Sequence, residues 1–338
     1  MTPTDNGTGR IRVGGVEISG RAFLAPMAGI SDAPFRAIAE RYGAAMVVSE
    51  MIASASLTSG MAEMKRKLRP SGRLPHVDQL AGNEKKWLVL GARMAADAGA
   101  DIIDINLGCP SKKVTNGYAG SALMRVPDKA LALIEAVIKA VDLPVTVKMR
   151  LGWNDQQINA PAIARLAEGA GVRMLVVHGR TRQQFYKGKA RWEPVRDVVE
   201  AVSIPVVVNG DVVDIASARR ALAASGAAAV MIGRGAQGQP WLVGQVNREL
   251  MGEGPHCSPD KEELFAIIIG HYREILATYG RKLGVRVARK HLRWYLQRAG
   301  IGEPDIRQSA LLTLDDAERV IATIKKMLDF HFQSRSAA

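Results

Sequence analysis

Short apolar runs alternate with Ala-rich segments of helical periodicity through most of this chain, and this alternation constrains the fold more than any other feature. Runs this short and this apolar are typical of strands that are covered on both faces, as parallel strands are. A strand, a helix and a second strand in succession favour parallel pairing with a right-handed crossover. Eight such runs therefore predict an α/β fold of the (β/α)₈ TIM-barrel type. The predicted strands are residues 22–26, 45–48, 74–80, 101–106, 144–149, 174–178, 205–209 and 228–233.

An open, doubly wound parallel sheet is the alternative architecture. Such a sheet favours a G-x-G-x-x-G fingerprint after its first strand. Residues 26–32 (PMAGISD) occupy that place and do not match the fingerprint, so the barrel is preferred. Ahead of the barrel, residues 13–18 predict a short strand or one arm of a hairpin. The clearest helical segments between the strands are residues 85–98, 128–141, 160–169 and 214–224.

The composition changes at residues 252–259 (GEGPHCSP), where turn-forming residues gather and the strand pattern stops. We therefore predict a barrel domain over residues 1–250 and a small all-helical domain over residues 251–338. Asp315 and Asp316 supply a helix-start signal within the second domain. The three helices expected there are residues 261–280, 284–300 and 314–332.

The chain carries 46 Lys and Arg residues against 33 Asp and Glu residues, a formal net charge of +13. Such an excess favours a polyanionic partner, although many basic proteins bind nothing acidic, so charge alone leaves both possibilities open. No apolar run approaches the ~18 residues of a membrane-spanning helix. The first residues also lack the apolar stretch of a signal peptide. We therefore expect a cytoplasmic protein that has no membrane contact.

The two cysteines, Cys109 and Cys257, lie far apart and belong to no C-x-x-C pair or Cys/His array. Their spacing predicts neither a disulfide nor a metal site. Cys109 is the more informative of the two, because residues 102–121 change from an apolar strand into a glycine-punctuated loop that carries the thiol. A free cysteine is often inert core packing. Its place between Gly and Pro at the carboxyl end of a barrel strand favours chemistry instead.

Polar residues gather where the predicted strands end. Active sites of (β/α)₈ barrels form at the carboxyl ends of the strands, so these residues are site candidates, although any one of them could be only a hydrogen-bonded strand-end group. Lys148 is the sharpest case, because a cation in an apolar strand is costly to bury unless it meets an anion or an electron-rich ring. Small residues and backbone N–H groups at residues 209–211 and 233–236 predict a phosphate site, and hence a phosphorylated cofactor. The strand-end residues are Met27, Glu50, Gln79, Asn106, Lys148, His178, Arg180, Asn209 and Arg234.

Cations are clustered in the middle of the predicted helical domain. Residues 275–302 contain seven Lys and Arg residues and no carboxylate. Four of the cations share one face of the second predicted helix, as the spacing of three and four residues requires. This face is either solvated or a surface for nucleic-acid phosphates. The four residues are Arg286, Arg289, Lys290 and Arg293.

Five ordered segments resemble the signature blocks of the tRNA-dihydrouridine synthase family, and most closely those of its B-type bacterial branch. In that family an FMN-bearing barrel reduces the C5–C6 double bond of a uridine in tRNA, with NADPH as the reductant. The resemblance covers most of the chain and implies a tRNA partner, FMN as cofactor and NADPH as co-substrate. The segments are residues 24–35 (LAPMAGISDAPF), 104–111 (DINLGCPS), 147–153 (VKMRLGW), 177–182 (VHGRTR) and 208–211 (VNGD).

Carried over to this sequence, the resemblance implies a role for each matched residue. Cys109 would donate the proton that uracil C5 receives after hydride passes from flavin N5 to C6. Lys148 would face the pyrimidine edge of the flavin. The residues implied in cofactor binding are Pro26, Met27, Ala28, Gln79, Lys148, His178, Asn209, Gly210, Asp211, Gly233 and Arg234. Those expected to bind substrate are Asn106, Arg180, Arg286, Arg289, Lys290 and Arg293.

Two other functions are open to such a chain. A dihydroorotate-dehydrogenase-like FMN barrel would act on a free small molecule and would need no cationic helical domain. A non-catalytic RNA-binding protein would leave Cys109 and the polar strand ends without a purpose. We expect the protein to be a monomer that binds no metal.

Overall fold

The computed structural model describes residues 9–53, 63, 66–254 and 258–336, and within these ranges eight parallel strands close into a barrel. Each barrel strand pairs with the next along the chain, and the last pairs with the first. The predicted (β/α)₈ barrel is therefore confirmed. Cys257 and part of the predicted domain boundary lie outside the described residues. The barrel strands are β3 (Ala22–Leu24), β4 (Met46–Val48), β6 (His76–Ala81), β7 (Ile102–Leu107), β8 (Val145–Arg150), β9 (Met174–His178), β10 (Val206–Asn209) and β11 (Ala229–Ile232).

An extra strand, β5 (Ile52–Ala53), follows β4 and was not predicted. Its two residues pair with Leu80 and Ala81 at the carboxyl end of β6. A run of two residues is too short to stand out as an apolar pattern. Since the other edge of β6 pairs with β7, β5 continues the pairing of β4 along β6 toward the barrel mouth.

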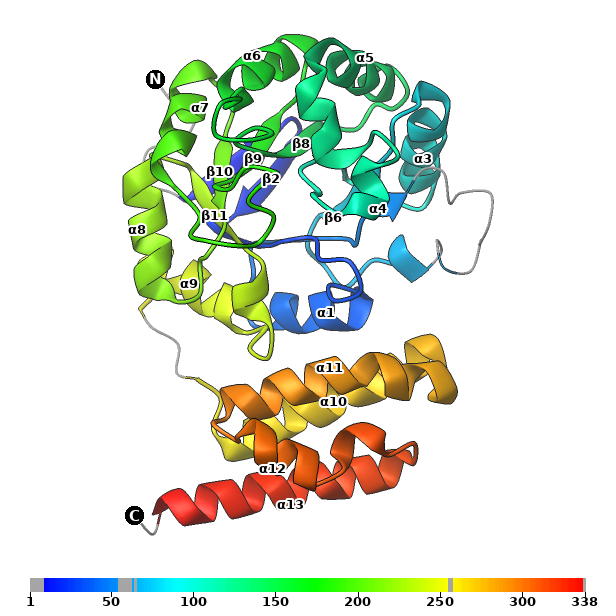
Figure 1. Cartoon of the computed structure of the whole chain (residues 1–338), viewed down its shortest axis with the longest axis vertical. Helices are drawn as coiled ribbons and strands as arrows, with labels where there is room; N and C mark the ends of the chain where they lie inside the picture. Colours follow the sequence, from blue (N-terminus) through cyan, green and yellow to red (C-terminus); the bar gives the residue numbers. More distant parts are fainter. Residues whose placement is uncertain (1–8, 54–62, 64–65, 255–257, 337–338) are drawn as a thin grey trace.

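Helices cover the outside of the barrel (Figure 1). Side chains at their starts and glycines at their ends set their limits. Asp32 caps the first helix by accepting the Phe35 N–H, and Gly171 and Gly226 end two others in the left-handed conformation that glycine adopts without strain. Within the described ranges, every helix is too short or too polar to span a bilayer. The helices of this layer are α1 (Ala33–Arg41), α3 (Lys85–Asp97), α5 (Pro127–Ile138), α6 (Ala160–Ala170), α7 (Arg196–Ala201), α8 (Ile215–Ser225) and α9 (Leu242–Leu250), with the short α4 (Lys112–Thr115) in the loop after β7.

An antiparallel hairpin, β1 (Arg10–Val13) and β2 (Val16–Ser19), closes one end of the barrel. Its buried side chains Ile11 and Ile18 pack against residues at the starts of the strands, such as Met46, Ile102 and Met174. The amino-terminal end is therefore filled by apolar side chains. The opposite end, at the carboxyl ends of the strands, is therefore the end at which a ligand-binding site can form.

Four helices and a short 3₁₀ turn, Leu311–Thr313, form the C-terminal region in the part of the chain that the structure describes. The sequence analysis missed α12, whose six residues are too few for a clear apolar period. It also placed the start of the second helix at Gly284, whereas the helix begins at Arg281. The expected start signal of the last helix is present, because the Asp316 side chain accepts the Arg319 N–H at 2.9 Å. The helices are α10 (Lys261–Tyr279), α11 (Arg281–Arg298), α12 (Glu303–Gln308) and α13 (Ala317–Ser336).

The C-terminal helices pack directly on α1 of the barrel (Figure 1). Ile38 of α1 belongs to the same buried cluster as the core of the helical region. The Phe35 ring lies 5.8 Å and 5.6 Å from the rings of His271 and His291. The two parts of the chain therefore share an apolar interface beside the start of α1.

Candidate active site

A cavity of about 520 Å³ lies at the carboxyl ends of the barrel strands. This volume is in the range of pockets that hold cofactors and small ligands. The structure brings together here almost all of the barrel residues that the sequence singled out. They are Pro26, Met27, Ala28, Gln79, Asn106, Cys109, Lys148, His178, Asn209, Gly210, Asp211, Gly233 and Arg234.

Lys148 on β8 extends its ammonium into this cavity. Its Nζ donates a hydrogen bond of 2.9 Å to Asn209 Oδ1, and the Asn209 amide in turn donates to the Met231 carbonyl at 2.8 Å. Burial, assisted by the nearby Arg150 guanidinium, lowers the pKa of Lys148 to about 8, whereas Asp104 and Cys109 act in the opposite direction. A cation with this pKa is still mostly charged at neutral pH, and an anionic ligand would hold it in the charged form.

A chain of hydrogen bonds orients the amides on the adjacent strands. The buried Asp104 carboxylate accepts from Thr146 and from Gln79, both at 2.7 Å, and Asn106 donates to Gln79 Oε1 at 2.8 Å. Burial raises the pKa of Asp104, while its two donors lower it. Only one orientation of each side-chain amide, Gln79 and Asn106, satisfies all of its hydrogen-bond partners. The network therefore fixes the orientation of both amides at the cavity.

Cys109 follows β7 in a loop that several hydrogen bonds fix. Asn106 Oδ1 accepts the Cys109 N–H at 2.9 Å, and the Cys109 carbonyl accepts from the Ser121 hydroxyl at 2.9 Å. A Cβ at Gly120, which has φ of +58°, would lie 2.8 Å from that carbonyl oxygen, so only glycine allows this close approach. Burial raises the pKa of the Cys109 thiol above its ordinary value. The thiol is therefore protonated at neutral pH and can donate a proton.

His178 ends β9 and is neutral. Burial, followed by the surrounding cations Arg150 and Lys148, holds the pKa of His178 well below its ordinary value. Its Nδ1 accepts the Arg180 N–H at 3.2 Å, which leaves Nε2 as the donor of the ring. The imidazole can thus offer one hydrogen bond to a ligand in the cavity.

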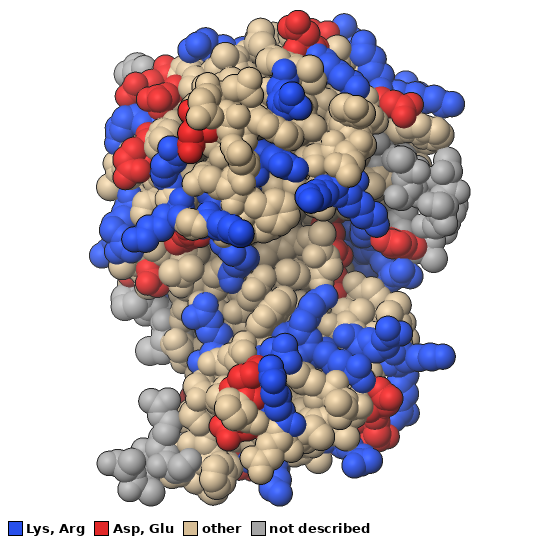
Figure 2. Space-filling view, viewed as in Figure 1, with Lys and Arg blue, Asp and Glu red and all other residues tan. Residues whose placement is uncertain are grey.

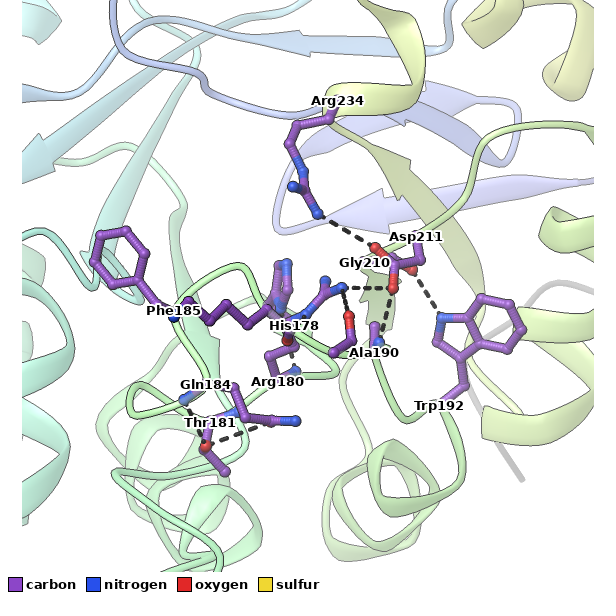
Figure 3. Close-up of polar contacts among 12 residues, drawn as sticks. His178, Arg180, Thr181, Gln184, Phe185, Ala190, Trp192, Gly210, Asp211 and Arg234 are labelled. Atoms are coloured by element: carbon purple, nitrogen blue, oxygen red, sulfur yellow. Dashed lines mark hydrogen bonds and ion pairs between the residues drawn. The ribbon is translucent and has the colours of Figure 1, made fainter.

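Arg180 and Asp211 form the centre of a polar network behind the cavity wall (Figure 3). Arg180 Nη2 lies 2.7 Å from Asp211 Oδ2 and also donates to the Gly188 carbonyl at 2.6 Å. The same carboxylate oxygen accepts the Ala190 N–H at 2.8 Å, and Arg234 lies 3.4 Å from the other oxygen. Arg180 is only 2% exposed and does not line the cavity. Arg180 therefore holds the residue 187–190 loop and the Asp211 side chain in place.

Glycines at the ends of β10 and β11 bring the backbone close to the cavity. A Cβ at Gly235 would lie 2.2 Å from the Val212 carbonyl oxygen, and one at Gly210 would lie 2.8 Å from Ala190 Cβ. These positions exclude side chains, so backbone groups border the cavity beside the Arg234 guanidinium, which is 52% exposed. A stretch of backbone without side chains, next to a guanidinium, suits a phosphate. Together with the Lys148 cation and the apolar wall at Pro26 and Met27, this donor set fits a phosphorylated flavin.

The match to known proteins decides the family. The family model for dihydrouridine synthase (Dus) matches residues 23–328. The chain belongs to the dihydrouridine synthase family. It is 49% identical over 314 residues to a probable tRNA-dihydrouridine synthase of Rhizobium leguminosarum bv. phaseoli, with 93% of this chain and 97% of the relative covered. It is 40% identical over 329 residues to tRNA-dihydrouridine synthase B of Pseudomonas putida, with 96% of each chain covered.

Two solved structures resemble the chain in fold alone. Histamine dehydrogenase from Rhizobium sp. 4-9 gives a TM-score of 0.56 at 14% identity, over 96% of this chain and 65% of that one. A morphinone reductase variant in complex with tetrahydroNAD gives 0.54 at 14% identity, over 77% and 94%. The family resemblance that the sequence predicted is thus confirmed by the family model and the relatives.

Among the cavity residues of this dihydrouridine synthase family member that the sequence analysis missed are Arg150 and Tyr186. The buried Arg150 guanidinium donates to the carbonyls of Gly108, Thr181 and Phe185 at 2.7, 2.8 and 2.9 Å. It therefore ties the Cys109 loop to the loop after β9. Strand alternation could have found it, because Arg150 lies two residues after Lys148 and faces the same way.

Tyr186 lies between two cations at the cavity edge. The guanidinium carbons of Arg150 and Arg234 lie 5.6 Å and 5.4 Å from the centre of its ring. Both distances are within the range of cation–π attraction. Because Tyr186 sits in an irregular loop, neither helical nor strand periodicity could have placed it here.

The four cations predicted to share one face of α11 have different surroundings. Arg289 pairs with Asp315 at 2.9 Å and Arg293 with Glu303 at 3.2 Å, both on neighbouring segments of the helical region. Lys290 instead donates to the Gly29 carbonyl of the barrel. Arg286 is exposed. In the view of Figure 2, Lys and Arg side chains lie beside the hollow of the barrel and along the adjoining part of the helical region.

Proposed function

We propose that this chain reduces the C5–C6 double bond of uridines in tRNA to 5,6-dihydrouridine, with FMN as cofactor and NADPH as reductant. The family supplies the reaction class. The observation that carries the proposal is the meeting of a protonated thiol, Cys109, and a buried ammonium, Lys148, on one cavity at the barrel mouth. A reduction of this kind needs a proton donor at one carbon and a hydride source at the other.

FMN would lie against Pro26, Met27 and Ala28, with its phosphate beside the glycines that end β10 and β11 and the Arg234 guanidinium. When bound, FMN supplies the hydride that uracil C6 receives, after NADPH has reduced it. Lys148, fixed by Asn209, places a positive charge in the cavity and stabilises negative charge on the cofactor. Gln79 is held by Asp104, so its amide can hydrogen-bond a polar ring edge.

Cys109 completes the reaction by transferring its proton to C5 of the uracil. Its raised pKa keeps the sulfur protonated until negative charge develops at C5. The thiolate that remains regains a proton from solvent. Asn106 contributes twice, because its Oδ1 fixes the Cys109 backbone while its Nδ2 fixes Gln79. The neutral His178 offers the Nε2 hydrogen bond to the bound ring system.

The target uridine must leave its stack to reach this cavity, at a cost on the order of a few kcal/mol. Phosphate contacts on the protein surface would offset this cost. We assign the helical region, residues 251–338, to tRNA binding, with Arg286 as a direct contact. Arg289 and Arg293 would have to exchange their carboxylate partners for phosphates to take part. Arg180 contributes indirectly, by fixing Asp211 and the loop at residues 187–190.

The dihydroorotate-dehydrogenase-like alternative is less favourable. It shares the FMN-binding barrel but acts on a free small molecule. The family model extends to residue 328, through most of the helical region, and such a region has no use in that reaction.

Purified protein tests the proposal directly. It should be yellow, release FMN on denaturation and oxidise NADPH. Unmodified tRNA incubated with the enzyme and NADPH should gain two hydrogen atoms per reduced uridine, as measured by mass spectrometry of nucleosides. NADPH oxidation that leaves the tRNA unchanged while reducing a free pyrimidine would favour the alternative.

A further inference from the structure

The loop between β3 and α1 faces the cavity on one side and the helical region on the other. Met27 and Ile30 line the cavity. The turn is compact, because the N–H groups of Ile30 and Ser31 donate to the Met27 carbonyl at 2.9 Å and 3.0 Å. The Ser31 hydroxyl accepts the Met27 N–H at 2.7 Å. Whatever fixes this loop from behind therefore also fixes the cavity wall.

Two side chains of the helical region hold the loop from behind. Lys290 Nζ on α11 donates to the Gly29 carbonyl. The Tyr279 hydroxyl, at the end of α10, donates to Asp32 Oδ2 at 3.0 Å. The Gly29 N–H donates to Glu50, which follows β4. The peptide groups of Gly29 are therefore held on one side by the barrel and on the other by the C-terminal helices.

The surroundings of Lys290 differ from those of an exposed surface cation that is available to bind RNA phosphates. The side chain is half-buried, and burial lowers its pKa while Asp32 and Glu50 act to raise it. Two carboxylates of the barrel therefore already attract its charge, although burial has the larger effect. Gly29 has φ of +72°, a conformation that suits glycine and sets the direction of the carbonyl that Lys290 binds.

We infer that Lys290 is a positioning residue for the cofactor site, through which the docked helical region fixes the Met27–Ile30 wall before any tRNA is bound. The inference rests on the proposed function, since it takes FMN as the occupant of the cavity. A loop that is ordered in advance costs less to order when the cofactor binds, so the contact raises cofactor affinity. The opposing possibility, the one the sequence suggested, is that Lys290 contacts RNA.

The two possibilities differ in experiments that contain no tRNA. The full-length chain is prepared free of flavin as wild type, Lys290→Met and Tyr279→Phe, with Lys282→Met as a matched control. Lys282 is exposed on the first turn of the same helix. Each protein is titrated with FMN, binding is followed by flavin fluorescence, and the absorption spectrum of the bound flavin is recorded.

Lys290→Met is expected to weaken FMN binding by about 5- to 20-fold, because only part of the roughly 10- to 150-fold effect of one hydrogen bond from a charged donor is transmitted through the loop to the cofactor. Tyr279→Phe, which removes only a hydroxyl, should weaken it by about two- to fivefold. Both should alter the flavin absorption bands, and Lys282→Met should match wild type.

Wild-type FMN affinity and spectrum in both Lys290→Met and Tyr279→Phe would overturn the inference, and a selective loss of tRNA affinity in Lys290→Met would then mark an RNA contact. Failure of the wild-type protein to bind FMN would instead overturn the proposed function. Circular dichroism of each variant separates loss of the contact from loss of the fold.

Discussion

The ammonium of Lys148 should make the flavin-free protein less stable at neutral pH than at alkaline pH. In the folded protein the pKa of Lys148 falls from 10.5 to about 8. At about 1.36 kcal/mol per pKa unit, this difference corresponds to at most about 3 kcal/mol of folding free energy. Because the side chain borders an open cavity, solvent reduces the cost, and we expect about 1–2 kcal/mol.

The sign of the effect follows from proton binding. Between about pH 8 and pH 10.5 the unfolded chain keeps the Lys148 proton while the folded chain releases it. The free energy of unfolding therefore rises with pH over this window. Lys148→Met removes this dependence. The Asn209 hydrogen bond that the substitution also removes changes stability by an offset that does not depend on pH.

Urea unfolding of flavin-free protein measures the difference, with both chains in a Cys109→Ala background because the thiol titrates in the same range. The stability of the Lys148 protein relative to Lys148→Met should increase by about 1–2 kcal/mol between neutral pH and about pH 10. Bound FMN should reduce this increase, since an anion retains the proton on Lys148. A constant difference across the range, or a relative loss of stability of the Lys148 protein, would show that this lysine is not a desolvated cation.

Three further substitutions test other parts of the site. Arg150→Met should cost about 2–3 kcal/mol in urea unfolding, because three carbonyls lose a buried donor; a change below about 0.5 kcal/mol would argue against its role in joining two loops. Arg180→Leu should weaken FMN binding, since the Asp211 carboxylate beside the phosphate site loses its closest cation, and unchanged affinity would separate that ion pair from cofactor binding. Arg286→Gln should reduce the magnitude of the slope of log K against log salt for tRNA binding by about 0.7 to 0.9. A wild-type slope for Arg286→Gln would place the RNA surface elsewhere.

The sequence predicted the barrel well because both faces of its strands are buried, which makes each strand a continuous apolar run. The eight predicted runs all became barrel strands, with ends that differ by at most two residues. The two-residue β5 and the six-residue α12 were not predicted, since neither is long enough to show a periodic pattern of apolar residues. The barrel also made the cavity predictable, because the ends of parallel strands meet at one place.

The direction of individual long side chains could not be predicted in the same way. Arg180 lies only two residues after His178, the last residue of β9, yet it turns behind the wall to Asp211 because the residue 187–190 loop supplies its other acceptors. Lys290 and Arg286 lie one turn apart on α11, and only the docking of that helix on the barrel gives the first a partner. Contacts between segments distant in sequence decided both outcomes.

The central claim, that Cys109 supplies the proton for uridine reduction, is tested most directly by measuring the two half-reactions of wild type and Cys109→Ala by rapid mixing. Flavin reduction by NADPH should proceed at the same rate in both proteins, since the thiol takes no part in it. When the reduced enzymes are mixed with unmodified tRNA, dihydrouridine should form at least about 100-fold more slowly in Cys109→Ala, the effect typical of losing a general acid. Formation of dihydrouridine by Cys109→Ala at the wild-type rate would contradict the account.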